Sequence, residues 1–189
     1  MSEPPGRQQR SSFGGLIGAM LVLVLMIGAF VLLRDANRLA PADAVRPVDY
    51  TQPARFARRV ARFDLLAPRR LPAGWVATSV RFEDDAEEQS WHVGVLTDAQ
   101  RYIGVEQAER TVASMVEDFV DEEATAAGEV DVDGEAWARW TDPERDPEAD
   151  PAAPSDGDLA LVREVGGASV VVVGRASEEQ LSELAASLR

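Results

Sequence analysis

The stretch LALVREVGGASVVVVG, residues 159–174, decides the fold. Its two halves, Leu159–Val165 and Ala168–Val173, are rich in β-branched and other apolar residues, and two glycines separate them where a turn is expected. The run Val170–Val173 is apolar on both faces of a strand, so we expect this strand to lie in the centre of a sheet that is covered on both sides. The pattern therefore predicts a layered domain built on a sheet.

Three more strands are expected upstream, because apolar and polar residues alternate there in short runs. These strands are residues 75–82, 90–96 and 102–107. Proline and glycine in Leu71-Pro72-Ala73-Gly74-Trp75 form a turn before the first strand, and Thr97-Asp98-Ala99-Gln100 has the length of a hairpin connection between the last two. We expect a three-stranded meander.

Residues 109–123 have the pattern of a helix with one buried stripe. The apolar positions of that stripe are Val112, Met115, Val116, Phe119 and Val120. Asp133-Gly134 then separates two short strands, residues 129–132 and 135–141, as expected of a two-residue hairpin turn. A last helix is expected after Ser177, which can cap it while Gln180 reciprocates three residues later.

Together these elements predict an α+β domain over residues 65–189, an antiparallel sheet of about six strands with two or three covering helices. Within it, residues 142–158, DPERDPEADPAAPSDGD, combine proline with a high density of acids. Such a segment buries little apolar surface, so we expect a mobile acidic loop there.

Residues 13–33, FGGLIGAMLVLVLMIGAFVLL, contain no charged residue and follow a polar tail, residues 1–12. A helix of this length reaches about 31 Å, which matches the roughly 30 Å hydrocarbon core of a bilayer. We therefore expect a transmembrane helix that binds the lipid bilayer. The alternative is a cleaved signal peptide, for which Ala42-Asp43-Ala44 has a small-x-small form. The apolar run exceeds the roughly 7–15 residues of the apolar region of a signal peptide, and the small-x-small site is distant from it.

The glycines Gly14 and Gly18 form a G-x-x-x-G pair, which can support a weak homodimer of transmembrane helices, although glycine is also common in such helices without dimerisation. Arginines flank the apolar segment on both sides, so their count does not decide its orientation. The simpler topology keeps the N-terminus in the cytoplasm and exports the domain, and the reverse remains open.

Residues 34–64 are expected to be a juxtamembrane linker followed by a basic amphipathic segment. Within it, residues 55–63 are expected to form a short amphipathic helix, in which Phe56, Val60 and Phe63 share one face surrounded by arginines. The segment is expected either to lie on a membrane surface or to pack on the domain as its first helix.

Charge is distributed unevenly in this chain of net charge −14. Residues 34–70 carry nine arginines against four aspartates, a net +5, whereas residues 71–189 carry eight arginines against 28 acids, a net −20. An acidic domain of this kind repels nucleic acid, so nucleic-acid binding is not expected. The basic stretch favours anionic headgroups instead.

The chain has no cysteine and one histidine, His92, which excludes disulfides, thiolate metal sites and cysteine nucleophiles. It also lacks a G-x-S-x-G motif, a phosphate loop and a dinucleotide fingerprint. His92 is expected to be structural, with acid–base catalysis as the alternative. We therefore predict no catalytic residue, no cofactor and no enzymatic activity. A hydrolase with a carboxylate-based site is the alternative function.

Two acidic groups invite a metal-binding interpretation. Asp131 and Asp133 would occupy positions three and five of a calcium loop, but position twelve would be Trp140 instead of a bidentate glutamate. A hairpin turn is the better interpretation. The second group is expected to be a solvated loop, and its members are Glu83, Asp84, Asp85, Glu87 and Glu88. No metal site is predicted.

The tryptophans are the other conspicuous set. With three of them expected on strands, they could line a groove for an apolar or sugar ligand, and packing in the core is the competing interpretation. The candidate ligand-binding residues are therefore Trp75, Trp91, His92, Trp137 and Trp140.

The order of short motifs along the chain resembles the bacterial domain of unknown function 4245 family. The motifs that carry the resemblance are Leu71–Trp75 (LPAGW), Trp91–Val95 (WHVGV), Tyr102–Val105 (YIGV), Asp133–Trp137 (DGEAW) and the Val170–Gly174 strand before the last helix. Members of that family are small, singly anchored, uncharacterised membrane proteins. The resemblance thus favours an extracytoplasmic domain and supplies no catalytic residue.

The function expected from these observations is a membrane-anchored, non-catalytic, extracytoplasmic module of the bacterial cell envelope. It would bind an envelope protein or an apolar ligand, or take part in an assembly.

Overall fold

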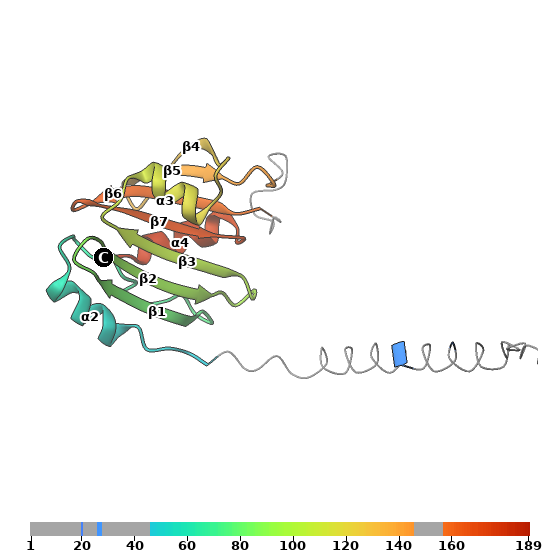
Figure 1. The fold of residues 1–189 in the computed structure, drawn as a ribbon, viewed down its shortest axis with the longest axis horizontal. Coiled ribbons are helices and arrows are strands. Elements are labelled where there is room, and N and C mark those ends of the chain that lie inside the picture. The colour runs from blue at the N-terminus through green and yellow to red at the C-terminus, as the bar shows by residue number, and fades with distance from the viewer. Residues whose placement is uncertain (1–19, 21–25, 28–45, 146–156) are drawn as a thin grey trace, which may run out of the picture. The chain divides into compact units, whose positions relative to one another are not determined.

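The computed structural model describes residues 20, 26–27, 46–145 and 157–189 (Figure 1). Contacts divide the chain into two units, Met1–Val45 and Arg46–Arg189. The expected tail, membrane helix, Gly14/Gly18 pair and first part of the linker lie outside the described residues, except for Met20, Met26 and Ile27. None of the helices formed by the described residues combines the length and the apolar character needed to cross a bilayer.

The second unit is an α+β domain whose seven strands form one antiparallel sheet in the order β1-β2-β3-β7-β6-β5-β4. The strands are β1 (Val76–Asp84), β2 (Gln89–Leu96), β3 (Tyr102–Ala108), β4 (Thr125–Val132), β5 (Glu135–Thr141), β6 (Leu159–Val165) and β7 (Ala168–Gly174). The predicted fold class is thus confirmed. The sheet has seven strands instead of about six, because every alternating or apolar segment of the domain pairs with a neighbour.

Strand β7 is the centre of the sheet, as its sequence predicts. It pairs with β3 on one side and with β6 on the other, and all of its residues are buried. Val170 and Val172 join the core on one face, whereas Val171 and Val173 join the core on the other. Each fully buried valine contributes roughly 1.5–3 kcal/mol to folding, so β7 ties the two layers together.

Two helices cover opposite faces of the sheet, as Figure 1 shows. Helix α3 (Val112–Phe119) is shorter than the predicted 109–123, because Thr111 already caps it by accepting a hydrogen bond from the Ser114 amide. Helix α4 (Glu178–Ser187) begins with the predicted capping box between Ser177 and Gln180.

A third helix, α2 (Thr51–Val60), precedes the sheet and packs on β1. It begins and ends earlier than the amphipathic segment expected from the sequence, and its buried residues are the small Ala54 and Ala57. Phe56 and Val60 are exposed, and Phe63 is buried only beyond the end of the helix. Helix α2 therefore belongs to the same compact unit as the sheet, although its packing face is not the one expected.

Two buried glutamines hold the segment that follows α2. Gln107 accepts a hydrogen bond from the Leu66 amide at 2.8 Å and donates one to the Asp64 carbonyl at 2.9 Å. Gln89 accepts one from the Arg62 amide at 2.7 Å. Since unpaired backbone groups are costly to bury, these side chains fix the path of residues 61–66.

The same segment also meets the last residues of the domain. Ala67 and Arg189 exchange backbone hydrogen bonds of 3.3 and 3.2 Å, and the Arg69 amide donates to the Ser187 carbonyl at 2.9 Å. We call residues 61–75 the collar. Hydrogen bonds hold this segment to the sheet on one side and to residues 187–189 on the other.

Two connections between strands were predicted from the sequence: the hairpin turn at Asp133-Gly134 and the acidic loop of residues 142–158. Asp133 and Gly134 have φ angles of 54° and 82°, so the predicted β4–β5 hairpin turn is confirmed, and the Asp131 carboxylate accepts the Gly134 amide at 3.1 Å. Of the expected acidic loop 142–158, residues 146–156 lie outside the described residues. Its described ends are in contact: the Asp142 amide donates to the Asp158 carbonyl at 3.1 Å.

Candidate functional site

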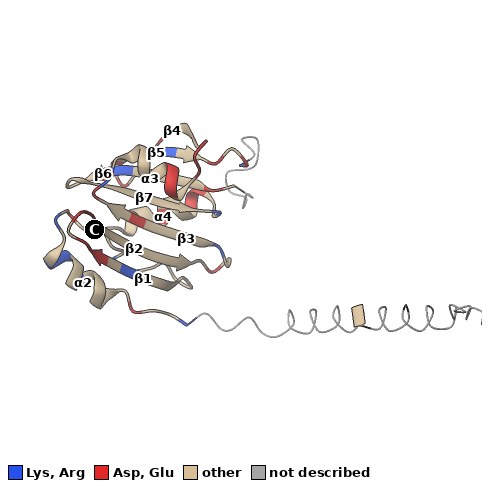
Figure 2. Cartoon of the chain, viewed as in Figure 1, with Lys and Arg blue, Asp and Glu red and all other residues tan. Residues whose placement is uncertain are grey.

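One half of the sheet is left largely open on the side of α3, because this helix packs mainly on β6 and β7 (Figure 1). The open half comprises β1, β2 and β3, and Figure 2 shows charges of both signs on it. We call it the polar face, and its residues are Ser79, Arg81, Ser90, His92, Tyr102 and Glu106. Polar side chains gathered on an uncovered sheet face make it the candidate functional site.

A β-bulge places Ser79 on this face. Ala77 pairs with Val95 and Ser79 pairs with Gly94, so Thr78 is an extra residue on β1. Side chains two residues apart on a regular strand point the same way, but the bulge reverses this rule. Ala77 therefore lies in the core, only 3% exposed, while Ser79 points to the opposite side. Bulges of this kind commonly re-aim a side chain near a functional site.

Three side chains form a hydrogen-bonded chain across the polar face. The Ser79 hydroxyl lies 2.7 Å from His92 Nε2, and His92 Nδ1 lies 2.6 Å from Glu106 Oε1. The His92 and Glu106 side chains are only 14% and 12% exposed. A carboxylate only accepts hydrogen bonds, so Nδ1 donates to it and the Nε2 of a neutral ring accepts from Ser79. The ring is thus held in one orientation and one tautomer.

Tyr102 extends this chain by a fourth member. Burial raises the pKa of the Tyr102 phenol, and a hydrogen bond with Ser79 opposes that rise. The hydroxyl stays protonated at neutral pH. It reaches Ser79 because Gly94 lies beneath it: a Cβ at Gly94 would come within 2.6 Å of Tyr102 Oη and still closer to Ser79 Oγ. The site therefore requires glycine at position 94.

A hollow of about 180 Å³ opens beside the pair of His92 and Glu106. It lies between the polar face and α3, which contributes Met115 and Phe119, and Arg81 lines it as well. Ligand pockets for drug-sized molecules are roughly 300–1,000 Å³, so this hollow accommodates one side chain or one ring of a larger partner. It offers a cation, a carboxylate and an imidazole within one small volume.

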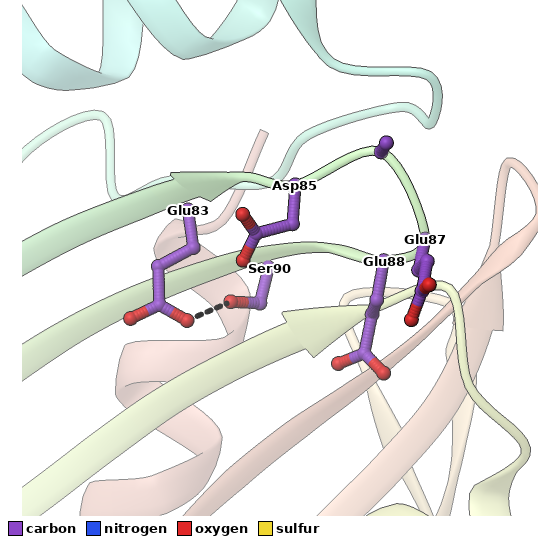
Figure 3. Close-up of a pocket in the computed structure, with 6 residues that line it drawn as sticks. Glu83, Asp85, Glu87, Glu88 and Ser90 are labelled. Atoms are coloured by element: carbon purple, nitrogen blue, oxygen red, sulfur yellow. Dashed lines mark hydrogen bonds between the residues drawn. The ribbon is translucent and has the colours of Figure 1, made fainter.

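A second, more open hollow of about 500 Å³ lies at the β1–β2 connection (Figure 3). Carboxylates of Glu83, Asp85, Glu87 and Glu88 surround it, and Ser90 donates a 3.3 Å hydrogen bond to Glu83. Among the described residues, no three metal-ligating side chains come close enough to hold an ion. The geometry is that of a solvated acidic turn.

The tryptophans proposed from the sequence lie elsewhere. Trp75, Trp91 and Trp137 are 8%, 0% and 2% exposed and belong to the core on the α4 side of the sheet. Trp140 packs against the other core, beneath α3. His92 lies on the polar face, separated from Trp91 by the sheet itself. The five candidate residues therefore do not share one surface, and the buried rings of Trp91 and Trp137 offer little area to a ligand.

Of the six polar-face residues, only His92 was identified from the sequence, and its neighbours Ser79, Tyr102 and Glu106 were not. A signal for Glu106 exists, because the short β2–β3 turn sets a register in which His92 faces Glu106. No such signal exists for Ser79, whose orientation depends on the bulge.

No curated protein matches the chain. A family model does match it over residues 8–188, nearly the whole length, and is described as a protein of unknown function, DUF4245.

Proposed function

Because this chain belongs to the DUF4245 family of proteins of unknown function, we propose its role from its own residues: a membrane-anchored, extracytoplasmic binding module of the cell envelope. In this role the polar face recognises a hydrogen-bonding group of an envelope partner, and the protein acts by binding and not by catalysis.

The fixed chain from Ser79 through His92 to Glu106 is the observation that carries this proposal. Hydrogen bonds of 2.7 and 2.6 Å hold the side chains before any partner arrives. Such preorganisation saves the cost of ordering side chains on binding, about 0.5–1.5 kcal/mol for each one. The adjacent hollow is lined by Arg81, whose guanidinium can donate hydrogen bonds to a carbonyl or anionic group of the partner in place of its 3.3 Å ion pair with Glu83. The buried tryptophans support a polar partner more than the apolar ligand expected from the sequence.

The anchor in this proposal is the apolar segment 13–33, whose length fits a bilayer core. Protease added to intact, wall-stripped cells should digest residues 46–189 and spare a cytoplasmic control protein. Protection of the domain would contradict the extracytoplasmic location.

Site-specific photocrosslinking in intact cells tests the polar face. A photoreactive residue replaces Arg81 on the polar face or, as the matched control, Glu117, an exposed residue of α3. We expect a discrete adduct from position 81, none of that size from position 117, and loss of the adduct when His92→Ala is added. Equal adducts from both positions, or no adduct from position 81, would rule out this binding surface.

A hydrolase is the second candidate, and the order of hydrogen bonds favours it. The hydrogen bonds run from Ser79 to His92 and from His92 to Glu106. In serine hydrolases the same order joins the nucleophilic serine, the histidine base and the carboxylate that orients the histidine. His92 would take the Ser79 proton as Oγ attacks an ester carbonyl, and would return it to the leaving alcohol; water would then release the acyl group. This arrangement differs from the carboxylate-based hydrolase considered from the sequence.

Labelling by a fluorophosphonate probe separates the two candidates. A hydrolase predicts labelling that Ser79→Ala and His92→Ala abolish, while Ser90→Ala, on the same face but paired with Glu83, leaves it unchanged. A binding module predicts no labelling of the folded wild-type chain.

A further inference from the structure

Helix α2 turns its large apolar side chains away from the domain. Phe56 is 53% exposed and Val60 is 38% exposed, whereas Ala54 and Ala57 are almost fully buried. At 3.6 residues per turn, Phe56 and Val60 share one side of the helix, with the buried alanines on the other. Phe56 touches the domain only edge-on, with its ring centroid 6.5 Å from that of Phe82.

Arginines flank these exposed apolar residues. Arg55 and Arg59 are exposed, lie on the same side of α2, and make no ion pair with any described residue. The other two arginines near this helix are engaged by the domain: Arg58 donates to the Leu65 carbonyl at 3.4 Å, and Arg62 pairs with Glu109 at 2.6 Å. The helix contains no acid, although residues 71–189 carry a net charge of −20.

We propose that the outer face of α2, formed by Arg55, Phe56, Arg59 and Val60, docks on the anionic headgroups of the bilayer. Exposed apolar side chains with arginines beside them are the pattern of a helix that lies in a membrane interface. The charge is complementary, because this face is basic in an otherwise acidic domain. Each arginine near an anionic surface favours the docked state about fivefold at low salt.

This inference rests on the proposed membrane anchor, since residues 34–50 reach at most roughly 60 Å from the end of the apolar segment. A surface helix tethered over so short a span meets the bilayer at high effective concentration. Docking would also orient the domain. Helix α2 packs into the core on the α4 side, whereas the polar face lies on the α3 side, so docking leaves the polar face free.

The absence of cysteine from the chain allows a direct test with the full-length protein. Phe56→Cys is labelled with an environment-sensitive fluorophore and reconstituted into phosphatidylcholine vesicles, with or without roughly a third of phosphatidylglycerol. We expect a blue shift, and quenching by nitroxide-labelled lipids, only with phosphatidylglycerol. Glu117→Cys on α3 is the matched control and should show neither effect. Adding Arg55→Gln and Arg59→Gln, which removes two positive charges, should lower the equilibrium constant for docking by about 30-fold and remove the signal.

Flotation of the same vesicles separates this inference from the anchor itself. Carbonate-resistant flotation with pure phosphatidylcholine reports the anchor, whereas the fluorophore at position 56 reports α2. An anchored protein whose position 56 behaves like position 117 in both lipid mixtures would overturn the docking proposal alone. Salt-sensitive binding to phosphatidylglycerol without carbonate-resistant flotation would overturn the anchor and support docking. Val60→Cys repeats the test if Phe56→Cys lowers stability through its contact with Phe82.

Discussion

The Ser79 hydroxyl lies 2.7 Å from His92 Nε2 because a bulge at Thr78 turns Ser79 away from the core. Without that extra residue, Ser79 would follow Ala77 to the buried side of β1, where a hydroxyl has no partner among valines and tryptophans. A single backbone irregularity thus creates the polar chain that ends at Glu106.

Gly94→Ala should destabilise the domain by about 1–3 kcal/mol, because the added methyl group overlaps the Tyr102 and Ser79 hydroxyls. Urea unfolding followed by tryptophan fluorescence measures the loss. Gly104→Ala is the control, since its Cβ comes closest to the flexible Glu106 carboxylate, at 3.2 Å, and lies at ordinary contact distances of 3.7 and 3.8 Å from Tyr102. If Tyr102 is the obstacle, Tyr102→Ala should recover part of the stability lost in Gly94→Ala.

Ser79→Ala and Glu106→Gln should each cost about 0.5–1.5 kcal/mol of unfolding free energy, because the first removes a hydrogen-bond partner of His92 and the second replaces a charged acceptor by a neutral one. Their effects should be non-additive by at least about 0.5 kcal/mol, since both act through the same imidazole. A double-mutant cycle by urea unfolding checks this. Strict additivity would mean that the two hydrogen bonds are independent. Ser90→Ala, whose partner Glu83 is exposed, should stay within about 0.5 kcal/mol of wild type.

Gln107→Leu should cost about 1–3 kcal/mol, because it leaves the Leu66 amide and the Asp64 carbonyl without their partners in a partly buried environment. Hydrogen exchange of residues 61–66 should increase as well. Gln52→Leu, on the exposed side of α2, is the matched control. Unchanged exchange in Gln107→Leu would show that other contacts hold this segment.

Asp158→Asn should alter the dependence of stability on pH. Burial raises the pKa of the Asp158 carboxyl above its usual 3.8, an effect that Arg175 opposes and the Asp142 charge reinforces. The folded state therefore binds its proton more tightly than the unfolded state, so Asp158 lowers stability as pH rises through and above 3.8. Asp158→Asn should be at least as stable as wild type at pH 7, and the difference should shrink below pH 4. Thermal melts across this range test the sign, and a growing advantage at low pH would contradict it.

Much of the fold was predictable because it depends on local patterns. The apolar run of β7, the Asp133-Gly134 turn and the Ser177 cap each carry their signal in a few neighbouring residues, and each is confirmed. The packing face of α2 was not predictable in this way. Ala54 and Ala57 fit closely against β1 because they are small, and a hydrophobic pattern gives greater weight to Phe56 and Val60.

The candidate site was less predictable than the fold, for a physical reason. His92 stood out as the only imidazole, but its partners come from two other strands. The register of a short hairpin could have identified Glu106. The bulge that orients Ser79 depends on the balance of packing along the whole β1–β2 ladder, and no residue type in the sequence predicts it.

The position of α2 and the collar also has a mechanical consequence. Tension on the chain ahead of residue 46 would reach α2 first, then the collar, and the sheet last. Helix α2 buries only two alanines, so its separation from β1 should need little free energy. Separating two strands instead requires that a whole ladder of hydrogen bonds break. Pulling from residue 46 in a single-molecule experiment should therefore give a small early extension before the main unfolding event. Helix α2 would then absorb tension on the chain while the arrangement of Ser79, His92 and Glu106 stays intact.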